Sequence, residues 1–340
     1  MKINSEKRVC LGIDVSKGSL DCCLFDGTKS INRKFKSNNL NTVKKIIKHF
    51  AISSSSCSVV VESTGIYHSF VFFGFAKQGY NVSIVNPLRT KSFATMTNLS
   101  RTKTDSTDAK IIAEYGFQCK PAPTVMKEDY QYKVEGFLKL IRFNQKQIAM
   151  NTNFLEALKH NAFKCGVVEQ KEIVQGIIQR HKENNKKLEK KIEALLNENC
   201  KELHQRYRSI PGVGPMLAAS LISFYGDFSE FSDAKKAAAF AGICPKINQS
   251  GSSVNKKVGI SKRGNPTLRT IFYMASLSAS VFNQSCKEKY QKMRAAGKPA
   301  KVALIAIANK ILRQAMALAR KGEFFNQNYE ENRQLAIKTA

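Results

Sequence analysis

The chain has 340 residues and a formal net charge of +29, from 55 Lys and Arg against 26 Asp and Glu. This length allows two domains with separate cores, and the charge indicates a polyanionic partner. No apolar run approaches the roughly 20 residues that span a bilayer, and the N-terminus lacks signal-peptide features, so no membrane partner is expected. The nine cysteines are scattered, which disfavours zinc and a disulfide scaffold and fits a reducing cytoplasm. Nucleic acid is therefore the predicted partner.

The first part of the chain predicts an α/β layered domain over residues 1–122. Apolar and β-branched runs separated by turn-length spacers predict three strands. Helices and strands then alternate, in the order βββαβαβα. The expected strands are 9–15, 20–25, 31–36, 57–62 and 81–86, and the expected helices are 39–50, 67–79 and one that begins at 105.

Residues 123–206 predict a helical, coiled-coil arm for dimerisation. There is no proline between 124 and 210, and apolar residues recur at helical spacing. The second helix, over roughly 168–206, would be about 57 Å long, which suits a spacer or dimerising arm.

A mostly helical C-terminal domain is expected over 207–322, followed by a tail over 323–340. The domain opens on Pro211–Gly214, a Pro-Gly-Val-Gly turn. This turn suits either a phosphate-binding helix-hairpin-helix or a glycine turn between packed helices.

Acidic residues are rare in the N-terminal domain. Only three lie between Asp26 and Glu114, where 13 Lys or Arg occur. A DNA-binding surface is expected to have few carboxylates, because they repel phosphate. The carboxylates that remain in this domain are therefore candidates for a function. With the acid that ends the first strand they form a set that we call the acidic quartet: Asp14, Glu62, Asp105 and Asp108.

The positions of the acidic quartet indicate a metal site. Asp14 and Glu62 end two predicted strands, while Asp105 and Asp108 share one face at the start of a helix. Clustered carboxylates repel unless a cation lies among them, and oxygen donors suit Mg²⁺ or Mn²⁺. Taken singly, these acids could instead be turn residues or helix caps.

Four segments resemble the DEDD-type transposases of the insertion-sequence-110 family. They are GIDVSK (12–17), VVVESTGIY (59–67), IVNP (84–87) and RTKTDSTDAKIIAEY (101–115). Residues 239–276 are similar to the second domain of that family. The resemblance implies a RuvC-like, ribonuclease-H-type N-terminal fold, with the acidic quartet as its metal ligands.

The family also uses a serine in its C-terminal domain that forms a covalent phosphoserine link to DNA, and here the matching QSG serine is Ser250. Relatives pair a structured non-coding bridge RNA with donor and target DNA. The resemblance therefore implies a homo-oligomer, a dimer or a tetramer on DNA, that acts on element ends and target in the prokaryotic cytoplasm or nucleoid.

The surroundings of Ser250 fit that role. It lies in a polar stretch expected to be a flexible loop, and 54 residues from Ala234 to Lys287 contain nine Lys or Arg and no acid. The stretch also suits a solvated loop in which Ser250 has no special role. Phosphate contacts are expected from Arg89, Lys91, Arg101, Lys103, Lys256, Lys257, Lys262, Arg263 and Arg269.

Three other functions fit the same residues. A site-specific DNA invertase would share both motif sets. A RuvC-like metal-only nuclease would use the same acids with water as the nucleophile. A non-catalytic DNA-binding protein would need the charge alone.

Overall fold

The computed structural model describes residues 8–63, 65–97, 105–160, 166–245, 248–250, 254–256, 259–260 and 264–328, and only the backbone at 105–106, 248–250 and 254–256. The chain divides into two compact units, Met1–Met126 and Lys127–Ala340. A separate arm domain ending at residue 206 stays a prediction.

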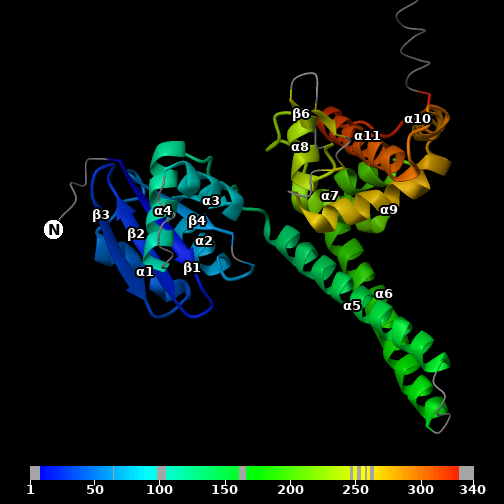
Figure 1. Ribbon diagram of the computed structural model, residues 1–340, viewed down its shortest axis with the longest axis horizontal. Helices are drawn as coiled ribbons and strands as arrows, with labels where there is room; N and C mark the ends of the chain where they lie inside the picture. The colour runs from blue at the N-terminus through cyan, green and yellow to red at the C-terminus, as the bar shows by residue number, and fades with distance from the viewer. Residues whose placement is uncertain are drawn as a thin grey trace, which may run out of the picture. The chain divides into compact units, whose positions relative to one another are not determined.

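The first unit is built on a five-stranded mixed sheet (Figure 1), in the order β3-β2-β1-β4-β5. β1, β2 and β3 pair in an antiparallel meander, and β4 and β5 run parallel to β1. The α/β prediction and its RuvC-like, ribonuclease-H-type architecture are confirmed. The strands are β1 (Val9–Val15), β2 (Leu20–Phe25), β3 (Ser30–Phe35), β4 (Cys57–Glu62) and β5 (Asn81–Val85).

Helices cover both faces of this sheet, which explains why β1 and β4 are apolar except near their ends. Leu11, Ile13 and Val59 pack on one face against α1 (Leu40–Phe50) and α2 (Ser69–Ala76). Cys10 and Val60 pack on the other face with α3 (Pro87–Met96) and α4 (Asp105–Cys119).

The backbone of α4 lies directly on β1 because Gly12 has no side chain. A Cβ added at Gly12 would lie 2.2 Å from the amide nitrogen of Ala113 and 2.5 Å from the carbonyl oxygen of Ala109. Further along α4, a Cβ at Gly116 would lie 2.5 Å from Sγ of Cys10. The helix therefore runs antiparallel to β1 and begins near the carboxyl end of that strand.

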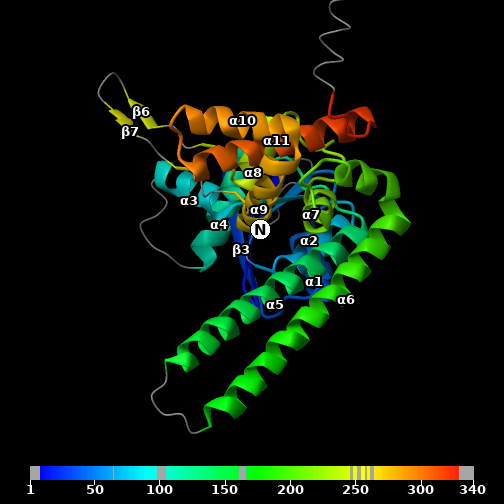
Figure 2. The ribbon, with the colours of Figure 1, turned by 90° about the vertical axis from the view of Figure 1, so that its right-hand side faces the viewer.

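The second unit begins with a long antiparallel helix pair, α5 (Asp129–Lys159) and α6 (Val167–Arg208). Figures 1 and 2 show these helices side by side, as predicted. α6 has 42 residues with a kink at Cys200, and the part before the kink extends about 50 Å. Asn144 donates to Asn185 at 2.8 Å, and Oδ1 of Asn144 lies 3.2 Å from Nδ1 of His181. A buried polar cluster of this kind sets helix register.

The rest of the second unit is mostly helical, as predicted. Its apolar core joins the base of α5 and α6 to five helices, and Tyr207 and Phe228 are fully buried in it. These helices are α7 (Pro215–Tyr225), α8 (Ala234–Ala241), α9 (Pro266–Phe282), α10 (Gln284–Ala295) and α11 (Ala300–Lys321). By length and composition α11 would suit a membrane span. The face of α11 that carries Ile307 and Ile311 is, however, buried in this core.

The Pro-Gly-Val-Gly turn ends α6 and contacts α9. Gly212 has φ +95°, and a Cβ there would lie 2.6 Å from the backbone nitrogen of Ala279. Of the two interpretations of this turn, the structure favours packing between helices at Gly212.

Candidate active site

Asp14 and Glu62 lie side by side on one face of the sheet. β1 and β4 pair in parallel with Ile13 opposite Val61, so the residues that follow occupy adjacent positions. In-register residues of neighbouring strands project from the same face. Here that is the face of Cys10 and Val60, which α3 and α4 cover.

The first turn of α4 brings the other two acids toward this edge of the sheet. Ala109, whose carbonyl contacts the Gly12 position, is one turn beyond Asp105 and next to Asp108. Since α4 begins near the carboxyl end of β1, its first turn lies on the same side as Asp14. Asp108 is half-buried, and only the backbone of Asp105 is described.

The donor chemistry of the acidic quartet fits a divalent metal. All four donors are carboxylates, the oxygen ligands that Mg²⁺ and Mn²⁺ prefer. Among side chains that the structure describes, no three His, Cys, Asp or Glu form a group able to hold a metal ion. Asp14, Glu62 and Asp108 belong to that set and do not form such a group as placed, whereas the Asp105 side chain lies outside the described residues.

A threonine on α3 orients Glu62. Thr90 is buried and its hydroxyl donates to Oε2 of Glu62 at 2.7 Å. α3 begins at Pro87, and the side chain of Asn86 caps it by accepting from the amide of Leu88. The helix also places Arg89 and Lys91 in solvent on either side of Thr90.

The structure adds a fifth acid that the sequence interpretation missed. Asp21 on β2 pairs with Asp14 in antiparallel register and so shares its face. It is buried, and its Oδ2 lies 3.1 Å from Nζ of Lys34 on β3. An acid inside a continuously buried strand was the available signal, because such a residue needs a partner.

Removing the Thr90 hydroxyl should leave the fold intact but let the Glu62 carboxylate move, which should slow catalysis. We expect Thr90→Val to lower the DNA cleavage rate about 10-fold, since Glu62 loses a charge-assisted hydrogen bond that limits its rotamers. Thr90→Ser should restore most of the rate. Cleavage rates against Mg²⁺ concentration would test this, and equal rates for all three proteins would contradict it.

Ser250 is the last residue of a short strand, so the expected loop is wrong at Gln249 and Ser250, while the rest of that stretch, 251–253, lies outside the described residues. β6 (Asn248–Ser250) pairs with β7 (Val254–Lys256), with Ser250 opposite Val254. Figure 2 shows this hairpin projecting from the helices of its unit. Pro245 and Ile260 form a bridge at its base. The local composition is polar, and only cross-strand pairing reveals the strand.

The predicted phosphate contacts are partly described. Arg89 and Lys91 are exposed on α3. Arg269 is half-buried on α9, and its Nη1 is buried with no hydrogen-bond partner among the described residues. Lys256 is described by its backbone alone. The remaining predicted contacts lie outside the described residues: Arg101, Lys103, Lys257, Lys262 and Arg263.

Two family models match this chain in separate segments. The model described as DEDD transposase of IS110 matches residues 11–162, which include the acidic quartet. The model described as transposase of the IS116/IS110/IS902 family matches residues 204–291, which include Ser250. Both sets of candidate residues thus lie inside matched segments.

Full-length relatives and solved structures match as well. The pilin gene-inverting proteins of Moraxella lacunata and Moraxella bovis are each 29% identical over 94% of this chain and 98% of their own. A transposase for IS1111A of Coxiella burnetii is 45% identical over 24% of this chain and 21% of its own. Thermus thermophilus RuvC is similar at 14% identity over 34% of this chain and 99% of its own, with a TM-score of 0.27. The fold assignment rests on the observed strand order and directions.

Proposed function

Since the chain belongs to the IS110/IS116/IS902 family of transposases, whose DEDD domain it carries, we propose that it cuts and rejoins DNA through a phosphoserine intermediate. Ser250 is the nucleophile, and the acidic quartet holds Mg²⁺ or Mn²⁺. The observation that carries this proposal is the placement of Asp14 and Glu62 on adjacent strands, under the helix that begins at Asp105.

The proposed reaction has two balanced steps. The Ser250 oxygen bonds to the scissile phosphorus and the bond from phosphorus to the 3′ oxygen breaks, with the serine proton ending on the 3′ hydroxyl. A 3′ hydroxyl of the strand to be joined then attacks the phosphoserine, and Ser250 regains its proton as it leaves. The phosphoserine ester conserves the energy of the phosphodiester bond that was broken. Rejoining therefore needs no energy-supplying cofactor.

The residues of this chain have distinct parts in these steps. The bound divalent ions would stabilise charge on the attacking and leaving oxygens. Thr90 holds Glu62 in position, and Arg89 and Lys91 offer phosphate contacts from α3. Arg269 and the basic segment around Ser250 provide the same contacts in the second unit.

Replacing the serine tests the covalent step. Ser250→Ala should abolish the covalent protein–DNA adduct, detected as a band that survives denaturing electrophoresis, because alanine has no oxygen to attack phosphorus. Mg²⁺ binding by the first unit should be unchanged. Ser252→Ala, a neighbouring hydroxyl, is the matched control and should keep the adduct.

Two results would overturn the proposed chemistry. An adduct that persists in Ser250→Ala would remove this serine from the reaction. Metal-dependent cleavage by the wild-type protein without any adduct would instead establish a metal-only nuclease.

The partners follow from the family. We propose that the protein acts on the ends of an element and on a target DNA, guided by a structured bridge RNA, in the prokaryotic cytoplasm or nucleoid. Sequencing the nucleic acid that copurifies with the protein tests the guide. One discrete structured RNA supports guidance, and DNA alone contradicts it.

The arm supports self-association. Exposed apolar residues on α5 recur at heptad spacing: Leu140, Phe143, Met150 and Phe154, each between 46% and 64% exposed. A second copy would cover this stripe. We expect Phe143→Glu with Phe154→Glu to convert the dimer to a monomer in sedimentation. Asn153→Glu, exposed on the same helix, should leave the dimer intact, and a dimer in all three proteins would contradict this role.

Inversion of a DNA segment is the second candidate function. It is favoured by the match to two gene-inverting proteins along nearly the whole chain. A plasmid carrying the candidate element ends in inverted orientation would separate the two functions. Recovery of flipped segments supports inversion, and recovery of insertions at a new locus supports transposition.

A further inference from the structure

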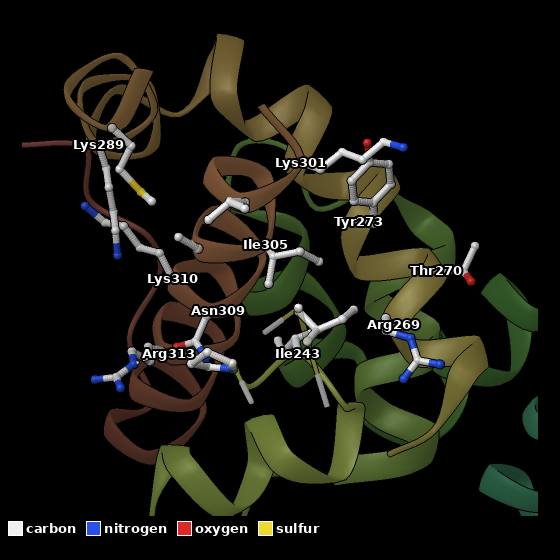
Figure 3. A pocket seen from close by; sticks show the side chains of 16 residues that line it. Ile243, Arg269, Thr270, Tyr273, Lys289, Lys301, Ile305, Asn309, Lys310 and Arg313 are labelled. Atoms are coloured by element: carbon white, nitrogen blue, oxygen red, sulfur yellow. Dashed lines mark hydrogen bonds between the residues drawn. The ribbon is translucent and has the colours of Figure 1, made fainter. Parts of the chain in front are cut away.

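The second unit contains a large pocket at the base of the Ser250 hairpin. Its volume is about 1070 Å³, and its walls come from α9, α10, α11 and the segments next to the Pro245–Ile260 bridge. Figure 3 shows Ile243 and Ile305 in the middle of the lining residues, with basic side chains around them. This size is at the upper end of small-molecule sites.

The lining of this pocket selects for an anion that also has an apolar part. Its residues include five cations and no acid: Arg269, Lys289, Lys301, Lys310 and Arg313. The rest of the wall is largely apolar, with the ring of Tyr273 among it. A nucleotide combines these properties, since its base stacks on an aromatic ring and its phosphate binds cations.

Two of these five cations, Lys310 and Arg313, also line a second pocket along α11. That pocket has a volume of about 820 Å³, and its lining includes Phe324 and Phe325. It contains one acid, Glu323, whose Oε2 lies 3.9 Å from Nζ of Lys321. In a single strand each phosphate links two nucleosides, so two cations shared by both pockets, each of which has an aromatic ring in its wall, suit the phosphate of one dinucleotide step.

We propose that these two pockets, which we call the α11 pockets, bind an unpaired dinucleotide of the DNA substrate. One base lies against Tyr273, the next against Phe324, and the linking phosphate lies between Lys310 and Arg313. This rests on the DNA chemistry of the family and not on the role of Ser250. It would hold an unpaired strand end at the base of the hairpin that carries Ser250.

The cations are held in place and concentrate positive charge. Nζ of Lys310 donates to the carbonyl of Ser285 at 2.9 Å, and Nε of Arg313 donates to Asn309 at 3.0 Å. Burial, followed by the nearby charges of Lys310 and Arg313, lowers the pKa of Lys289. An anion placed among these groups would relieve their repulsion.

The test compares a labelled DNA duplex that has a two-nucleotide unpaired overhang with the fully paired duplex. The wild-type protein should prefer the overhang. We expect Tyr273→Leu to reduce that preference about 10-fold, and Tyr273→Phe to keep it because the stacking ring remains. Lys310→Gln with Arg313→Gln should abolish it. The matched control, Lys287→Gln with Lys292→Gln, removes two exposed charges of α10 outside both pockets and should preserve it.

Several outcomes would overturn the proposal. Equal weakening of both probes would show general attraction to DNA, and unchanged binding in the pocket variants would leave the pockets to another class of occupant, such as an acidic peptide. A preference seen only with a ribonucleotide overhang would assign the pockets to RNA. Ser250→Ala should bind both probes like the wild type, so failure of the serine mechanism would be distinguishable.

Discussion

Replacing Glu62 by Gln, or Asp14 by Asn, is expected to reduce DNA cleavage on the order of 10³-fold while DNA binding stays near the wild-type level. Each change keeps the shape of the side chain but removes one negative charge from the proposed metal site, where carboxylate oxygens would balance a divalent cation. The parallel pairing of β1 with β4 places these two residues next to each other. If both hold the proposed metal, loss of either one should have a similar effect.

The measurement is the single-turnover cleavage rate, with Mg²⁺ binding followed by calorimetry on the same proteins. Glu114→Gln is the matched control, because Glu114 also lies in the first unit but forms an ion pair with Lys110 along α4 at 3.7 Å. It should retain near-normal cleavage, because Glu114 is outside the acidic quartet and already has a cationic partner. Wild-type rates and Mg²⁺ affinity in Glu62→Gln would exclude Glu62 from the metal site.

Gly12→Val is expected to destabilise the first unit by about 3 kcal/mol or more and to abolish cleavage. Its Cβ would overlap the backbone of α4, at 2.2 Å from the amide nitrogen of Ala113, and a helix backbone cannot move away as a flexible side chain can. Lifting α4 would also move Asp105 and Asp108 away from Asp14. Stability and function should therefore be lost together.

Hydrogen exchange of the β1 and α4 amides in the full chain measures this effect. Exchange there should accelerate strongly, while the amides of the second unit keep their protection. Gly18→Ala is the matched control, because an added Cβ at Gly18 meets nothing within 4 Å. Normal protection of α4 in Gly12→Val would show that the helix does not depend on this close approach.

The sequence by itself was sufficient for the five strands of the first unit and for the long helix pair of the second. The apolar runs 9–15 and 57–62 predicted strands, the second buried on both faces, and the structure has strands at those positions. The scarcity of acids among 13 Lys or Arg singled out Glu62, Asp105 and Asp108. These are local signals, since period, composition and charge can be counted along the chain.

Only the tertiary structure decided which side chains act together. In the sequence, Asp21 is a single acid in an otherwise apolar run. The antiparallel register of β1 and β2 places it opposite Asp14. The hydrogen bond from Thr90 to Glu62 joins residues 28 positions apart, and the α11 pockets combine residues from segments far apart in the chain. Such contacts depend on strand register and on how closely helices approach. Both are set by long-range packing, for example at Gly12, and composition does not encode them.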